Sequence, residues 1–180
     1  MIIAKAKKKE NIIEYLLYMF QIENMLRALN FEEERINREL ITHYDQPEDV
    51  MKEIRDWYNH LVRMMHDEHL EKKGHLQYLK NTMNDLYALH KRLLQTPEEI
   101  VYAEVFRKAV YDIAILEKKI NHPQAHDVEI ALEGIYAYLL LNIRKDKISN
   151  ETKEAINHIS RWLYLLGDKY KEMEKGEKEW

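Results

Sequence analysis

The chain has 180 residues, of which 46% are hydrophobic and 33% are charged, and its formal net charge is −4 at pH 7. This length and apolar content suit one compact domain, and the interleaved charges argue against the concentrated positive field of a nucleic-acid-binding protein. The sequence has no cysteine, which excludes disulfides, thiolate metal ligands and cysteine nucleophiles and fits a cytoplasmic protein.

Hydrophobic periodicity predicts helices along the whole chain and no strand. The predicted helices span residues 8–29, 32–44, 47–69, 74–95, 97–121, 127–146 and 149–174. Short connections between long helices favour antiparallel neighbours, so we expect an all-α fold, a mostly antiparallel up-and-down bundle of six or seven helices. We expect residues 1–174 to form one domain and residues 175–180 a flexible tail.

The first predicted helix carries two charged residues in the middle of its apolar face, Glu23 and Arg27. Side chains four residues apart share one face of a helix and can pair, and an unpartnered buried charge costs several kcal/mol. The pair is either structural or a ligand site in which Arg27 clamps a carboxylate or phosphate. A structural pair should tolerate joint replacement by apolar residues.

Prolines and a glycine mark the helix boundaries. Pro47 and Pro97 each precede two acidic residues, which predicts that both occupy first helical positions. Gly74 separates the third and fourth predicted helices, residues 121–123 separate the fifth and sixth, and Ser149 or Asn150 caps the last.

Histidines and carboxylates gather at the end of the third predicted helix, in His66-Asp67-Glu68-His69. The spacing of His66 and His69 allows both imidazoles to bind one metal ion. The alternative is a solvated helix end that complements the helix dipole. No histidine has an acidic residue three positions before it, which excludes a ferritin-like di-iron site, and His-Glu-x-x-His does not occur.

Two further polar residues lie among apolar ones. His90 is surrounded by leucine and methionine positions in the fourth predicted helix, and Asn142 falls in the apolar sector of the sixth. Each is either a buried, hydrogen-bonded core residue or a ligand-binding residue. The sixth predicted helix is apolar nearly all round over residues 135–143, which predicts a central helix or one that faces a second subunit.

Sequence motifs for catalysis and membrane insertion are few. The longest apolar run, residues 135–141, is far shorter than the roughly 20 residues that cross a bilayer. Phosphate-binding loops and the serine-hydrolase motif are absent from the sequence. Arg55 and His60 match the Arg-x4–6-His spacing of HEPN-like ribonucleases, but Arg38/His43 and Arg63/His69 match it too.

Three stretches of the sequence resemble a family of short, all-helical bacterial proteins that is classed as a domain of unknown function. They are residues 1–23, Lys-Gly-His-Leu-Gln at 73–77 and Ile-Ser-Asn-Glu-Thr at 148–152. The resemblance covers essentially the whole chain and places Gln21, Glu23 and Arg27 in a family-like segment. It implies a cytoplasmic helical protein and no known activity, so no catalytic residue is carried over.

Surplus apolar helical surface without a complete catalytic constellation favours a non-enzymatic interaction module, which forms a homo-oligomer or binds a protein partner. We expect no cofactor, no membrane segment and no nucleic-acid partner. One alternative is a ligand-binding bundle that uses Glu23, Arg27, His90 and Asn142, or a metal-binding one that uses His66 and His69. The second alternative is a HEPN-like ribonuclease.

Overall fold

The computed structural model describes residues 2–120 and 125–178, and the described residues are helical with no strand. The all-α prediction is therefore confirmed for this part of the chain. The helices are, in chain order, α1 (Ile2–Glu10), α2 (Ile12–Ala28), α3 (Glu33–Glu39), the 3-10 helix η1 (Ile41–His43), α4 (Glu48–Asp67), α5 (Gln77–Gln95), α6 (Ile100–Ile120), α7 (Asp127–Ile143) and α8 (Asn150–Glu174).

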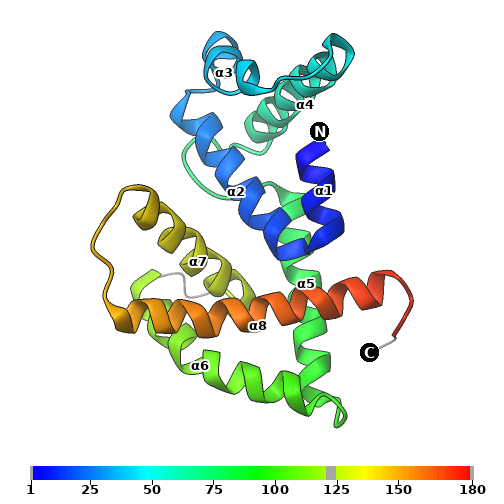
Figure 1. Cartoon of the computed structure of the whole chain (residues 1–180), viewed down its shortest axis with the longest axis vertical. Coiled ribbons are helices and arrows are strands. Elements are labelled where there is room, and N and C mark those ends of the chain that lie inside the picture. The colour runs from blue at the N-terminus through cyan, green and yellow to red at the C-terminus, as the bar shows by residue number, and fades with distance from the viewer. Residues whose placement is uncertain (1, 121–124, 179–180) are drawn as a thin grey trace.

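The long C-terminal helix α8 is the centre of the packing. It contacts α2, α5, α6 and α7, and Figure 1 shows it running between α6 and α7 and crossing α5. The helices α3 and α4 lie at the far end of the molecule, beyond α2. The helix contacts agree with a bundle.

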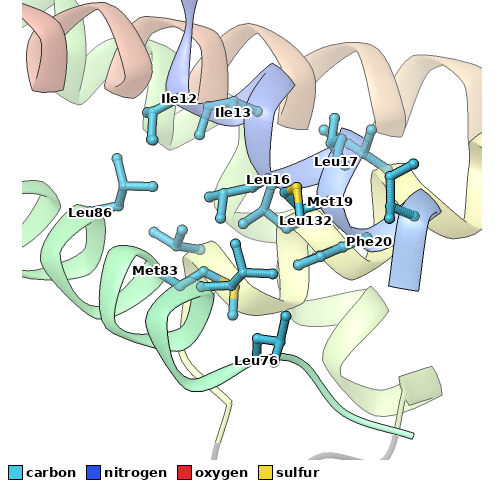
Figure 2. Packing of buried hydrophobic residues seen from close by; sticks show 14 of the residues in the cluster. Ile12, Ile13, Leu16, Leu17, Met19, Phe20, Leu76, Met83, Leu86 and Leu132 are labelled. Atoms are coloured by element: carbon cyan, nitrogen blue, oxygen red, sulfur yellow. The ribbon is translucent and has the colours of Figure 1, made fainter. Parts of the chain in front are cut away.

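One continuous cluster of buried apolar side chains joins these helices. Figure 2 shows its centre, where α2, α5 and α7 meet and where Leu16, Met83 and Leu132 lie close together. Burying large aliphatic side chains contributes about 1.5 to 3 kcal/mol each to folding. The cluster extends from Ala4 of α1 to Leu166 of α8, while the division into one domain and a tail stays a prediction.

Asn11 divides the first predicted helix, 8–29, into α1 and α2. Its side-chain oxygen accepts a hydrogen bond from the backbone N–H of Ile13 (2.9 Å), so Asn11 caps α2. Gly167 of α8 approaches so closely that a Cβ atom there would lie 2.5 Å from the Asn11 oxygen. The prediction of a single helix is wrong because a buried cap, held against α8, ends one helix and begins the next.

Two other boundaries differ from prediction. The predicted helix 32–44 ends at Glu39 and continues as η1. Pro97 lies in a turn in which Glu99 N–H donates to the carbonyl of Thr96 (3.0 Å), and α6 begins only at Ile100. Pro47 is the residue just before α4. Neither proline therefore occupies a first helical position.

The predicted boundary at residues 121–123 lies outside the described residues. For the start of α8 the sequence offered Ser149 or Asn150 as the cap, and the structure shows Ser149, whose hydroxyl accepts from the backbone N–H of Thr152 (3.2 Å). No helix in the described ranges combines the length and apolarity needed to cross a membrane.

Candidate functional site

Glu23 is buried on α2, with 1% of its surface exposed, and binds the loop between α4 and α5. One carboxylate oxygen accepts from the backbone N–H of Leu76 at the start of α5 (2.9 Å), and the other lies 2.5 Å from Nδ1 of His75. The His75 ring is stacked on Phe20 at a centroid distance of 3.7 Å. The carboxylate therefore fixes both the loop and the first turn of α5.

Arg27, one turn further along α2, binds the same loop. Its Nε donates to the carbonyl of Leu70 (2.9 Å), one terminal nitrogen donates to the side chain of Asn24 (2.9 Å), and the other donates to the carbonyl of Gly74. Gly74 has φ = +94°, a backbone conformation that favours glycine. Burial lowers the pKa of Arg27, and the negative charge of Glu23 acts in the opposite direction.

No ion pair within 4 Å joins Glu23 to Arg27 in the described residues. Direct pairing was the expectation, and the structure instead gives each side chain its own partners in residues 70–76. We define these contacts as the loop clamp. The sequence did not predict His75 and Leu76 as the partners of Glu23. The one sequence feature that pointed to this loop was a histidine next to a turn glycine, and the sequence of α2 does not indicate which residues its charged side chains bind.

His90 of α5 lies in a buried chain of hydrogen bonds. Trp162 Nε1–H donates to the hydroxyl of Tyr102 (2.9 Å), which lies 2.6 Å from Nδ1 of His90. The Tyr102 hydroxyl can donate to Nδ1 of His90, and the proton of the neutral ring then lies on Nε2, 3.8 Å from the Asp127 carboxylate. Burial lowers the pKa of His90 to about 4, so the ring is neutral at pH 7. His90 thus lies away from the loop clamp, joined to α6 and α8.

Asn142 of α7 is exposed, so the expected buried amide is wrong. Its side chain donates to the carbonyl of Tyr138 in its own helix (2.9 Å). The face of α7 that the sequence pattern marks as apolar is buried in the first half of the helix and partly exposed to solvent around Asn142. Glu23, Arg27, His90 and Asn142 therefore do not converge on one cavity.

His66 and His69 lie at the exposed end of α4. His66 Nδ1 pairs with Glu71 (3.1 Å), and its ring contacts Phe31. His69 has φ = +55° in the turn that ends the helix. In residues 2–120 and 125–178, no three or more His, Asp or Glu side chains are placed so that they could hold a metal ion.

The Arg and His residues of the ribonuclease-like spacing do not meet in a cleft. Arg55 pairs with Glu48 at the start of α4, and His60 is exposed. Shared geometry is the first requirement of an acid–base pair, so the structure brings no support for this alternative.

A cavity of about 450 Å³ lies between α2, α7 and α8, and we call it the α7 groove. Its lining is mainly apolar, with four tyrosines among the lining residues. At one edge Glu14 accepts from the hydroxyl of Tyr164 and pairs with Lys7 (3.3 Å). The lining includes Leu17, Tyr18 and Gln21 from α2, Tyr136, Tyr138, Leu139 and Ile143 from α7, and Ile156, Ser160 and Tyr164 from α8.

The C-terminal half of α7 borders this groove and exposes large apolar side chains. Ile143 is 70% exposed, and Leu139, one turn earlier on the same face, is also exposed; these two residues are the α7 patch, while the exposed Leu141 lies on the opposite side of the helix. Residues 134–143 contain no charged residue. The first half of α7 is instead buried, from Val128 to Ile135. The helix that we predicted to be central or to face a second subunit is therefore buried in its N-terminal half and exposed to solvent in its C-terminal half.

Together these features define an all-helical protein with a clamped loop and an open apolar helix end. The chain belongs to the family described as Domain of unknown function (DUF4924), whose family model matches residues 1–177. No curated protein and no solved structure matches the chain.

Proposed function

We propose that the protein is a helical interaction module that self-associates through the α7 patch and the α7 groove. The observation that carries this proposal is the exposed, uncharged end of α7 in a chain of which 33% of residues are charged. Exposed apolar side chains beside an apolar groove are typical of interaction sites, and the centres of homodimer interfaces are depleted in charge.

A second copy of the chain is the occupant that this surface favours. In a two-fold symmetric contact each residue near the axis faces its own copy, so a charge there would meet a like charge. The stretch 134–143 avoids that repulsion, whereas a different partner would gain from complementary charges. Leu139 and Ile143 of one copy can fill the groove beside the same residues of the other.

The other exposed apolar residues of the chain differ in their surroundings. Val101 of α6 is 69% exposed, which matches Ile143, and its neighbour Ile100 is 64% exposed, but the same helix also exposes Glu104, Arg107 and Lys108. Exposed apolar side chains among charged ones are ordinary. Val101 therefore provides a matched control position.

Sedimentation equilibrium of the wild type, Ile143→Glu and Val101→Glu tests the proposal. The wild type and Val101→Glu should form dimers, while Ile143→Glu should raise the dissociation constant by about 100-fold or more, because it buries a charge against its own copy. Circular dichroism should show equal helix content in all three. A monomeric wild type, or equal weakening by both substitutions, would contradict self-association through α7.

The loop clamp does not lead to a second candidate function. A ligand at Glu23 or Arg27 would have to compete with the backbone groups of Leu70, Gly74 and Leu76 that these side chains already bind. A ligand site there therefore remains the weaker proposal.

A further inference from the structure

A second cavity, of about 490 Å³, lies between α6 and the N-terminal half of α8. Its volume falls within the range of sites that bind small molecules, about 300 to 1,000 Å³. Four apolar residues contribute to its lining: Ile115, Leu116, Ala155 and Ile156. We call it the α6–α8 cavity; it lies apart from the loop clamp and from the His90 network.

A histidine–aspartate pair contributes to the wall of this cavity. His158 Nδ1 of α8 lies 2.9 Å from the Asp112 carboxylate of α6, and the Asp112 side chain is only 16% exposed. A neutral imidazole has one N–H, and a carboxylate can only accept. Asp112 therefore holds that proton on Nδ1 and leaves Nε2 as an acceptor, which has no other partner among the described residues.

The charges that line the cavity are mainly negative. Asp112, Glu151 and Glu154 are carboxylates, and Lys119 is the one lysine or arginine in the lining. Glu151 and Glu154 are exposed and form no ion pair within the described ranges. An excess of one sign of charge in a cleft raises the local concentration of ions of the opposite sign. Tyr111, which is 72% exposed, adds an aromatic face that can attract a cation.

We propose that the α6–α8 cavity binds a small organic cation that carries a primary ammonium group on an apolar body. The apolar body packs on Ile115 and Ile156, and the ammonium N–H groups donate to Glu154 and to Nε2 of His158. A carboxylate ligand would meet the negative rim, and a quaternary ammonium has no N–H to donate. The cavity shares one lining residue, Ile156, with the α7 groove. None of its other lining residues belongs to that groove, so the proposal does not depend on self-association.

Titration of the full-length protein, followed by amide NMR shifts, tests the proposal with three probes of similar size. Phenethylammonium should give saturable shifts in residues 111–119 and 151–158, with a dissociation constant of about 1 mM or lower, as expected for a fragment of this size. The anion 3-phenylpropanoate should give none there. The N-trimethyl derivative of phenethylammonium should bind more weakly.

Charge-matched variants then locate the ammonium. Glu154→Gln should weaken phenethylammonium binding by about two- to fivefold, the contribution of one exposed ion pair, and Glu151→Gln/Glu154→Gln should weaken it further. Glu104→Gln removes the same charge from exposed α6 outside the cavity and should change nothing.

Three results would overturn the proposal. They are equal binding of the anion or of the trimethyl derivative, shifts that do not saturate or that lie outside the cavity, and equal weakening by Glu104→Gln and Glu154→Gln. Because dimerisation is measured separately with Ile143→Glu, failure here leaves the proposed self-association unaffected.

Discussion

The loop clamp and the C-terminal half of α7 differ in whether their side chains find partners within the chain. At the clamp, two charged side chains lie against the hydrophobic core, and each polar group has partners in residues 70–76 of the same chain. At the end of α7, large apolar side chains are exposed, and none of the described helices covers them fully.

The difference shows which unusual feature indicates an external partner. Charges on an apolar helix face attract attention in a sequence, yet here the chain itself supplies their partners, so they hold its structure together. Exposed apolar surface attracts less attention, but the free energy of covering it is still available to a second molecule.

The largest effect is expected from Glu23→Ala. The substitution leaves the buried N–H of Leu76 and the ring of His75 without an acceptor and should lower the free energy of unfolding by about 3 to 5 kcal/mol. Urea denaturation measures this loss, with Glu53→Ala on the exposed face of α4 as the control that should change stability by less than about 0.5 kcal/mol.

Joint replacement of both charges distinguishes the loop clamp from an independent ion pair. Because the partners of Glu23 and Arg27 are loop groups, Glu23→Leu/Arg27→Leu should be less stable than either single variant. The opposite result, a rescued double variant, would show that the two charges matter mainly to each other, as the sequence alone suggested.

The His90 network should make stability depend on pH. Burial holds the pKa of His90 at about 4 in the folded state, against its ordinary value of 6.5. Between these values the unfolded chain binds a proton that the folded chain does not, so stability is lost as pH falls from about 6.5 to 4, by on the order of 3 kcal/mol.

His90→Gln should remove that loss, because glutamine keeps a hydrogen-bonding group near Tyr102 but does not titrate. Urea denaturation of both proteins at several values between pH 7 and pH 4.5 gives the difference directly. Burial also lowers the pKa of His126. His126 is present in both proteins and its charge also lowers the pKa of His90, so the difference between the proteins includes this coupling as well as the burial of His90. Parallel stability curves would show that His90 does not cause the pH dependence.

Gly167→Ala tests the contact that divides α1 from α2. The new methyl group would lie 2.5 Å from the Asn11 oxygen, and the overlap should cost about 1 to 3 kcal/mol of unfolding free energy. In an Asn11→Ala background the same substitution should cost less, because the clashing amide is gone. Equal costs in the two backgrounds, measured by thermal or urea unfolding, would mean that Asn11 is not the obstacle.

Asn142→Ala should have the smallest effect. Among the described residues the exposed amide binds a carbonyl of its own helix and no other group, and alanine has the higher helix propensity. The free energy of unfolding should therefore change by less than about 0.5 kcal/mol, in sharp contrast to Glu23→Ala. A loss of 2 kcal/mol or more would place Asn142 in a buried contact after all.

Much of the fold follows from local sequence patterns, while the boundaries depend on distant residues. The helical period places α4, α5 and α8 to within a few residues, because each has a continuous apolar face. The division at Asn11 could not be predicted, since it depends on Gly167 of α8 packing against that cap.

The candidate sites show the same limit. The pattern correctly marked Glu23 and His90 as buried, because both fall between core positions. It placed Asn142 in the core, because periodicity shows which face of a helix is apolar but not where along the helix the neighbouring helices stop packing against that face. It did not indicate His75 or the pair of His158 with Asp112, because these contacts join segments 52 and 46 residues apart.

A spin-label measurement tests most directly whether the α7 patch meets its own copy. The chain has no native cysteine, so Ala137→Cys on α7 and Ala114→Cys on α6 each provide one labelling site, both at exposed alanines. Electron paramagnetic resonance should show a concentration-dependent dipolar interaction between labels at position 137, and a weaker one or none at position 114. An interaction at 114 but not at 137, or at neither position at high concentration, would contradict self-association through α7.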